Sequence, residues 1–209
     1  MTGPHQGQRV ATAGAPLAAA KGAVVMVHGR GASAESILTL AQALDRPQFA
    51  YLAPAAAGCT WYPNGFMSPI ASNEPGISSG MQAIADVLAK VEAAGIPAER
   101  TVLLGFSQGA CLSLTFAARN ARRYGGVAAL SGGLIGPDGT PHDYAGSLDG
   151  TPVFLGCSDV DHHIPAARVE QSAQVIANLG GDVTLRLYRG MGHTVNEDEI
   201  AHVQAILDA

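Results

Sequence analysis

The sequence predicts an α/β fold in which helices cover both faces of a mostly parallel sheet. Short runs of β-branched residues and leucine alternate with longer, alanine-rich segments of helical period along the chain. Most of the short runs are apolar throughout, without the polar alternation of a sheet that has one wet face, which predicts strands buried on both faces. Strands that alternate with helices in this way are joined by helical crossovers and run parallel.

Six segments are expected to be strands because each is short, mostly apolar and bounded by turn-forming residues. They read AVVMV, FAYLA, TVLLGF, GVAAL, PVFLG and VTLRLY, and they span Ala23–Val27, Phe49–Ala53, Thr101–Phe106, Gly126–Leu130, Pro152–Gly156 and Val183–Tyr188. Ahead of them, Gly14 and Pro16 interrupt the mildly apolar stretch Val10–Ala20. Residues 1–22 are therefore expected to be a loop or an edge strand.

Five longer segments carry apolar residues at helical spacing and are expected to be helices. They span Ser33–Leu44, Gly76–Ala94, Gln108–Arg122, Ala166–Asn178 and Asn196–Leu207. The less regular stretches Ala55–Pro75 and Ser131–Gly150 are rich in Gly, Pro, Ser and Asp, and are expected to be surface loops rather than domain boundaries. A chain of 209 residues suffices for one well-buried core, so residues 1–209 are expected to form a single domain.

The composition narrows the class of protein. Hydrophobic residues make up 47% of the chain and charged residues 14%, with a net charge of −5 and no Lys/Arg cluster, which argues against nucleic acid and anionic membrane surfaces as partners. No apolar run approaches the length of a membrane span, so stable membrane insertion is not expected. Cys59, Cys111 and Cys157 are scattered and odd in number, and we expect buried, reduced thiols in a cytoplasmic protein.

The pattern G-x-S-x-G, which places a reactive serine in many hydrolases, occurs twice. The chemistry needs a strand that ends, a sharp strained turn that lifts the hydroxyl clear, and a helix that begins at once. GISSG, Gly76–Gly80, follows the helix-start signal Asn-Glu-Pro with no strand before it, so Ser78 is expected in the first turn of a helix. GFSQG, Gly105–Gly109, follows the strand TVLL and leads into a helix, which makes Ser107 the nucleophile candidate.

A serine hydroxyl needs a neighbouring base to take its proton, and the base needs an acid to hold its tautomer. In this architecture the acid and then the base follow the serine, each on a loop after a later strand. His193, in RGMGHTV after the last predicted strand, is the base candidate. Three other histidines, in the tail, a loop and a helix, are expected to be surface residues: His5, His142 and His202.

The acid candidates are Asp159 and Asp161 in CSDVDHHIP, the loop after the fifth predicted strand. They are two residues apart and cannot both point at His193, and spacing alone does not choose between them. The adjacent His162 and His163 invite a metal-site interpretation. No further Cys, His or carboxylate cluster stands at ligand spacing, so neither a metal nor another cofactor is expected.

Acyl transfer also needs two backbone N–H groups that bind the developing oxyanion, each worth about 3–4 kcal/mol. Gln108, which follows the nucleophile at the helix start, supplies one. The second is expected from the loop after the first core strand, VVMVHGRGAS, where glycines allow close approach and the Arg30 N–H is the candidate. A plain strand-to-helix turn and a phosphate-binding loop are the alternatives, although the spacing fits neither Walker A nor G-x-G-x-x-G.

On these residues the chain resembles the phospholipase/carboxylesterase family of α/β-hydrolases, which contains acyl-protein thioesterases and small bacterial carboxylesterases. The resemblance runs from about Val24 to the C-terminus and is most specific in GIPAERTVLLGFSQGACLSL, Gly95–Leu114. HGRGAS at His28–Ser33 is similar to the family's oxyanion loop, and YRGMGH at Tyr188–His193 is similar to its histidine loop. EPGI at Glu74–Ile77 falls where the family begins a helix.

The family's acid motif is an Asp followed by two residues, then Val or Ile, then Pro. Asp161–Pro165 matches it, so the resemblance selects Asp161 as the acid and leaves Asp159 as its neighbour. Two segments depart from the family: Cys157-Ser158 stands where His-Gly is usual, and Trp61-Tyr62-Pro63 stands where the thioesterases have a Trp-Phe-Asp-like segment. These differences leave the candidate Ser, Asp and His in place and bear on the substrate.

Together these features predict a serine carboxylesterase with an α/β-hydrolase fold, acting on short- to medium-chain esters. The chain has no insertion long enough for a lid domain, so an open pocket and a small-molecule ester are expected. Trp61, Phe66 and Met191 are apolar loop residues expected to shape the acyl or alcohol pocket, with ordinary loop packing as the alternative. An apolar patch near the pocket mouth could support a homodimer.

Two other functions stay open from the sequence. An acyl-protein thioesterase or lysophospholipase would apply the same chemistry to a long acyl chain. A non-catalytic α/β-hydrolase-like binding protein would be of another class, and such proteins tend to lose one of the three reacting side chains, all of which are present here.

Overall fold

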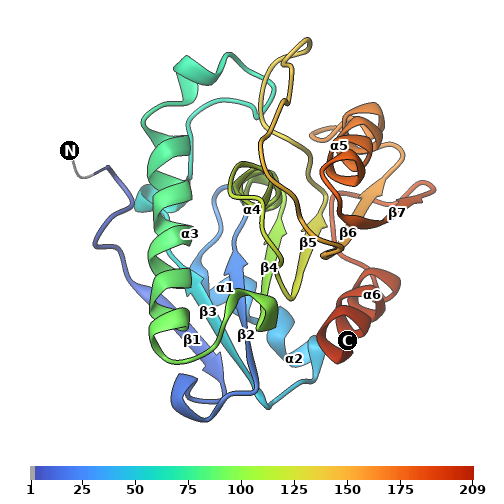
Figure 1. Cartoon of the computed structure of the whole chain (residues 1–209). Coiled ribbons are helices and arrows are strands. Elements are labelled where there is room, and N and C mark those ends of the chain that lie inside the picture. Colours follow the sequence, from blue (N-terminus) through green and yellow to red (C-terminus); the bar gives the residue numbers. More distant parts are fainter. Residues whose placement is uncertain (1–2) are drawn as a thin grey trace.

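The structure, a computed structural model, describes residues 3–209, and its centre is a seven-stranded sheet (Figure 1). The strands lie in the order β1-β3-β2-β4-β5-β6-β7. β1 runs antiparallel to β3, whereas every other pair of neighbours is parallel. Their bounds are β1 Val10–Gly14, β2 Gly22–Val27, β3 Phe49–Pro54, β4 Thr101–Phe106, β5 Gly126–Leu130, β6 Pro152–Ser158 and β7 Asp182–Tyr188.

All six predicted strands are confirmed, and their ends differ from the predicted ones by at most two residues. The N-terminal segment contributes the edge strand β1, as one of the two interpretations of residues 1–22 expected. Met1 and Thr2 lie outside the described residues. The continuous apolar runs are explained by burial, because every residue of β2 and β5 is buried.

Helices lie on both faces of this sheet (Figure 1). One apolar cluster joins α3, α4 and α5 to one face, and a second joins α1, α2 and α6 to the other. Alternate side chains of β2 enter the two clusters, Val25 and Val27 on one side and Val24 and Met26 on the other, as the strand period of two requires. The helices span α1 Ala34–Leu38, α2 Leu40–Leu44, α3 Gly76–Ala93, α4 Gln108–Arg119, α5 Ala166–Asn178 and α6 Glu197–Asp208.

Two predicted helices differ from the observed ones. The segment Ser33–Leu44 forms the two short helices α1 and α2, because the Thr39 hydroxyl donates to Ser36 O at 2.7 Å and the Thr39 N–H reaches the same carbonyl, which tightens the turn. The helix predicted over Gln108–Arg122 ends at Arg119. There Asn120 leaves the helical conformation, and its side-chain amide donates to Phe116 O at 2.9 Å.

The expected exposure of two histidines is wrong. His5 is only 4% exposed and His142 8%. Both nitrogens of His5 find partners, Trp61 O and the Ala57 N–H, which allows the ring to be buried. His142 Nδ1 contacts the Tyr144 hydroxyl, whereas its buried Nε2 has no partner among the described residues. Burial lowers the pKa of both imidazoles, which favours the neutral forms.

The three cysteines are free thiols, and two of them meet the expectation of burial. Cys111 and Cys157 are buried, and desolvation raises the pKa of each thiol to about 12. Cys59 is exposed, so the expectation is wrong for that residue. It ends a short 3-10 turn, with its backbone at a positive φ of 57°.

The carboxyl ends of the parallel strands meet at one edge of the sheet. The loops that follow β2, β4, β6 and β7 therefore lie together, and they carry His28–Gly31, Ser107, Asp161 and His193. None of the helices in residues 3–209 combines the length and the apolar composition that crossing a bilayer would need.

Candidate active site

Ser107 occupies a strained turn between β4 and α4. Its φ of 55° and ψ of −120° are unfavourable for a residue with a side chain. Gly105 and Gly109, two residues before and after Ser107, lie where there is no room for a side chain. A Cβ on Gly105 would overlap the Gly109 carbonyl, and a Cβ on Gly109 would overlap the Val27 carbonyl at the end of β2. This is the strand, sharp turn and helix that the GFSQG motif predicts.

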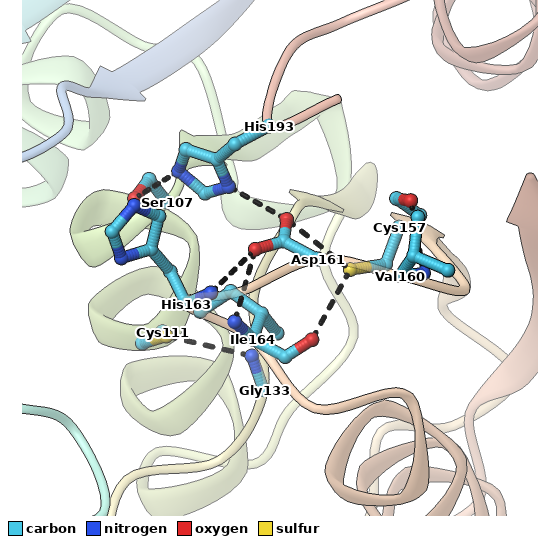
Figure 2. Close-up of polar contacts among 10 residues, drawn as sticks. Ser107, Cys111, Gly133, Cys157, Val160, Asp161, His163, Ile164 and His193 are labelled. Atoms are coloured by element: carbon cyan, nitrogen blue, oxygen red, sulfur yellow. Dashed lines mark hydrogen bonds and ion pairs between the residues drawn. The ribbon is translucent and has the colours of Figure 1, made fainter. Parts of the chain in front are cut away.

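The structure brings Ser107, His193 and Asp161 together from three separate loops (Figure 2). Ser107 Oγ lies 2.8 Å from His193 Nε2, and His193 Nδ1 lies 2.6 Å from Asp161 Oδ2. The Asp161 side chain is fully buried, whereas 24% of the His193 side chain is exposed. With Nδ1–H donating to the carboxylate, Nε2 is free to accept the serine proton.

The second oxygen of Asp161 is held by its own loop. Asp161 Oδ1 accepts hydrogen bonds from the His163 N–H at 2.8 Å and the Ile164 N–H at 3.1 Å, and the Cys157 thiol lies 3.9 Å from Oδ2 (Figure 2). Burial by itself raises the pKa of this carboxyl, but the hydrogen bonds from His193 and the two amides outweigh it and lower the pKa below its usual value. Asp161 is therefore an ionised acceptor at neutral pH.

The other acid candidate, Asp159, has a different role. Its Oδ1 accepts the Gly190 N–H at 2.8 Å, and its own N–H donates to Tyr188 O at 3.1 Å. Both partners belong to the segment that leads from β7 to His193. Asp159 thus ties the acid loop to the histidine loop, and it is Asp161 that contacts the imidazole, as the family's acid motif implied.

The two amides predicted to bind an oxyanion flank Ser107. Gln108 is the first residue of α4, where backbone N–H groups lack intrahelical acceptors. The turn that carries Arg30 passes close by, since a Cβ on Gly29 would stand 3.3 Å from Ser107 Cβ. Within residues 3–209 neither the Gln108 nor the Arg30 N–H donates to a protein acceptor. Both residues line the cavity that contains Ser107.

A cavity of about 280 Å³ lies beside Ser107. Apolar and aromatic side chains line much of it, and Arg30 and two imidazoles add polar groups. The lining residues are Arg30, Tyr62, Gly65, Phe66, Ser107, Gln108, Cys111, His163, Ile164 and His193. The cavity combines an apolar lining with a reactive group, as small-molecule sites commonly do.

Of the three predicted pocket residues, Phe66 lines this cavity and the other two do not. Trp61 is fully buried in the core, and its indole Nε1–H donates to His28 O at 2.8 Å. Met191 lies beside the Asn196 side-chain amide, with its sulfur 2.9 Å away. The predictions for Trp61 and Met191 are wrong because a loop aromatic can complete a core, and a residue near the histidine can turn towards the following helix.

Several lining residues were not predicted from the sequence. Tyr62 follows Trp61, which was predicted to shape the pocket, and Ile164 belongs to the acid motif Asp161–Pro165, so proximity in sequence was the one signal available for both. His163 was considered only as a metal ligand, yet its ring meets that of His193 edge to face, 4.9 Å between centroids. Cys111 lies one turn into α4, four residues after Ser107, so the helical period could have placed it on the same side as the nucleophile.

Comparison with known proteins settles the family. The model of the family described as Phospholipase/Carboxylesterase matches residues 9–209. The chain belongs to this family. The resemblance inferred from the motifs around Ser107, Asp161 and His193 is thus confirmed at the level of the whole chain.

Curated relatives of this chain are named acyl-protein thioesterase 1. The protein of Eremothecium gossypii is 27% identical over an alignment of 221 residues, which covers 91% of this chain and 90% of the relative. The protein of Gibberella zeae is 36% identical over 116 residues, or 54% of this chain and 49% of the relative. That second match therefore spans about half the length of the relative.

Solved structures of similar proteins confirm the α/β-hydrolase fold. The phospholipase/carboxylesterase of Dyadobacter fermentans superposes with a TM-score of 0.93 at 40% identity, covering 97% of each chain. The acyl-protein thioesterase 2 of Zea mays superposes with a TM-score of 0.73 at 20% identity, covering 96% of this chain and 98% of that one, which supports the fold alone.

Proposed function

We propose that this protein is a serine carboxylesterase that hydrolyses short- to medium-chain carboxylic esters through an acyl-enzyme. The observation that carries the proposal is the line of contacts from Ser107 Oγ to His193 Nε2, 2.8 Å, and from His193 Nδ1 to Asp161 Oδ2, 2.6 Å. A hydroxyl held in this way passes its proton to the imidazole as it attacks a carbonyl carbon.

Acylation begins when Ser107 Oγ attacks the ester carbonyl and His193 Nε2 takes the serine proton. The ionised Asp161 stabilises the imidazolium that forms. The negative charge on the former carbonyl oxygen is bound by the Gln108 and Arg30 N–H groups. His193 then gives its proton to the leaving alcohol, and the C–O bond breaks to leave the acyl group on Ser107.

Deacylation repeats these steps with water in place of the serine. His193 takes a proton from the attacking water, the same two amides bind the second oxyanion, and the proton returns to Ser107 Oγ as the acid departs. Every group that this cycle needs belongs to the chain itself, so the proposal invokes no cofactor.

The size of the cavity supports short acyl groups. Its volume of about 280 Å³ lies just below the range of roughly 300–1,000 Å³ that is typical of ligand pockets. The ring of Tyr62 and the thiol of Cys111, both buried, lie on its inner side.

A thioesterase acting on long acyl chains is the second candidate function. The observation that favours it is the name of the relatives, since the Eremothecium gossypii protein is an acyl-protein thioesterase 1 and matches 91% of this chain. A palmitoyl chain would need to leave the cavity by its mouth and lie over the surface. Hydrolysis of the two substrate classes would use the same Ser107 and His193.

Rates on p-nitrophenyl acetate, octanoate and palmitate test the proposal, with the matching thioesters measured alongside. We expect kcat/KM to be highest for acetate to octanoate and at least about tenfold lower for palmitate, because a chain that cannot be buried loses its apolar transfer energy. A preference for palmitoyl over octanoyl groups would favour the thioesterase. Failure to cleave any ester or thioester would contradict both candidates.

A further inference from the structure

The N-terminal segment places a buried imidazole against the loop that borders the active site. His5 contacts the loop of residues 56–64, here called the Trp61 loop, at two points. The Ala57 N–H donates to His5 Nδ1 at 3.1 Å, and His5 Nε2 lies 2.8 Å from Trp61 O. An amide N–H can only donate, so Nδ1 is the acceptor and Nε2–H donates to the Trp61 carbonyl. The ring is thus satisfied on both sides only when neutral.

The same segment is tied down to the start of α3. The His5 N–H donates to Ser79 Oγ at 2.9 Å, and Gln6 Nε2 donates to Ser79 O at 2.9 Å. The Ser79 hydroxyl donates in turn to Gln6 Oε1 at 2.8 Å. Ser79 belongs to GISSG, the pentapeptide that does not carry the nucleophile, so this motif has a use of its own: it anchors the N-terminal segment.

Trp61 lies between two imidazoles. The His5 ring meets the indole edge to face, 5.1 Å between centroids, and the His28 ring lies on the indole at 5.0 Å. The indole Nε1–H donates to His28 O. Burial lowers the pKa of His28 as it does that of His5, so both rings face Trp61 in the neutral form.

The Trp61 loop is also hydrogen-bonded to the backbone turn that carries the Arg30 N–H. The Ala56 N–H donates to His28 Nε2 at 3.1 Å, and the Gly31 N–H donates to Cys59 O at 2.7 Å. The peptide that offers the Arg30 N–H thus lies between two residues, His28 and Gly31, that are both bonded to this loop.

The Arg30 side chain and the second amide donor are bound to the same region. The Arg30 guanidinium donates to Pro63 O at 2.7 Å and to Asn64 O. The Trp61 N–H donates to Gln108 Oε1 at 2.8 Å, and Gln108 Nε2 donates to Tyr62 O at 2.8 Å. Both residues that carry the oxyanion N–H groups are therefore fixed against one loop, which His5 clamps from its far side.

We propose that His5 is a positioning residue for the oxyanion hole: by holding the Trp61 loop, its imidazole keeps the Arg30 and Gln108 amides aligned on the reacting carbonyl. The inference rests on the proposed esterase function. His5 does not line the cavity and touches no reacting group, so its effect on the reaction passes through Trp61 and Ala57. Small misplacements of catalytic groups cost large factors in rate, which makes such a distant clamp measurable.

The test compares His5→Ala with Gln8→Ala. Gln8 lies in the same segment, its side chain is exposed, and its backbone N–H donates to His5 O, so it is a matched control. Hydrolysis of p-nitrophenyl acetate is measured below the melting temperature of each variant, and kcat is calculated per site titrated with a fluorophosphonate. Unfolded protein is not titrated by the fluorophosphonate and therefore does not affect the calculated kcat.

For His5→Ala we expect kcat and kcat/KM to fall together by about tenfold, a fraction of the loss of about 10²–10³ that follows complete removal of one oxyanion donor. KM stays unchanged, because the lost interaction exists only in the transition state. His5→Gln places an N–H where Nε2 stands, and most of kcat returns. Trp61 is the only tryptophan of the chain, so its emission changes in His5→Ala and reports the loosened loop directly.

Several results would overturn the proposal. They are a per-site kcat in His5→Ala equal to that of wild type, a change in KM alone, an equal loss in Gln8→Ala, or a His5→Gln variant as slow as His5→Ala. Ser107→Ala separates this inference from the function beneath it. If that variant is inactive while His5→Ala is fully active, the clamp is wrong and the esterase stands; if Ser107→Ala still hydrolyses the ester, the function itself fails.

Discussion

The two G-x-S-x-G pentapeptides share a pattern and differ in every physical respect that matters for reactivity. In Gly76–Gly80, Ser78 lies in the first turn of α3, and its hydroxyl donates to the Glu74 carboxylate at 2.8 Å. In Gly105–Gly109, Ser107 has a positive φ and lies between a strand and a helix, and its hydroxyl is hydrogen-bonded to the His193 imidazole. As a class, carboxylates are too weakly basic to take a proton from a hydroxyl that they accept a hydrogen bond from, whereas imidazoles can act as general bases near neutral pH.

The second glycines of the two pentapeptides, Gly109 and Gly80, serve different ends, whereas the first glycines are both crowded by backbone, since a Cβ on Gly76 would stand 2.5 Å from Trp61 O. A Cβ on Gly109 would meet the backbone of Val27, and one on Gly105 would meet the backbone of Gly109. A Cβ on Gly80 would instead lie 2.7 Å from the tip of the Leu112 side chain, and a side-chain tip can move. The comparison teaches that Ser107 is set apart by its strained turn between β4 and α4 and by the close approach of Gly109 to the end of β2, which a five-letter pattern does not reveal.

Replacing the nucleophile should have the largest effect. Ser107→Ala is expected to lower kcat for p-nitrophenyl acetate by on the order of 10⁴–10⁶, because the hydroxyl that forms the acyl-enzyme is gone. Initial rates with freshly purified variant and wild type give the ratio. An activity loss of less than about tenfold would mean that another residue is acylated, and the distinction between the pentapeptides would fail.

Adding one methyl group to the second glycine of each pentapeptide should separate the two by stability. Gly109→Ala must displace the end of β2 and should cost about 3 kcal/mol or more, whereas Gly80→Ala pushes on Leu112 and gains about 1 kcal/mol of helix propensity in return. For a chain of this size each kcal/mol shifts the melting temperature by about 2–4 °C, so calorimetry resolves the difference. Equal shifts would show that crowding at the second glycine does not distinguish the two sites.

The smallest effect is expected at the other serine. Ser78→Ala removes an exposed hydrogen bond to Glu74, while the Ser78 N–H keeps its contact with the same carboxylate at 3.0 Å. Stability should change by less than about 1 kcal/mol and kcat by less than about twofold, as for most surface substitutions away from a site. Urea denaturation and ester hydrolysis measure both. A severe loss of activity here would assign Ser78 a part in the chemistry.

Much of the fold could be predicted because strands buried on both faces of a sheet have continuous apolar sequences. Thr101–Phe106 is mostly apolar, for example, and it forms a strand with the predicted bounds in the structure. The helix predicted over Ser33–Leu44 failed at Thr39, where a hydroxyl competes for a backbone carbonyl that helical periodicity does not register. Helix propensity is a property of the whole segment, whereas the break between α1 and α2 depends on the local hydrogen bond from the Thr39 hydroxyl.

The positions of Ser107, Asp161 and His193 could be predicted because the chain order of this architecture assigns the three side chains to loops after particular strands. Choosing between Asp159 and Asp161 needed the family's motif, since the spacing of two residues leaves the direction of each carboxylate undetermined. The position of His5 could not be predicted at all. Its partners Ala57 and Trp61 are more than 50 residues away in sequence, and only the folded chain brings them together.

Identifying the residue that a fluorophosphonate modifies tests the central claim most directly. Cleavage by trypsin after Lys90 and Arg100 puts the two serines on different peptides, with Ser78 on one that ends at Lys90 and Ser107 on the peptide Thr101–Arg119. We predict that mass spectrometry finds the phosphonyl group on Ser107 alone. Modification of Ser78, or no modification of the folded protein, would contradict the account.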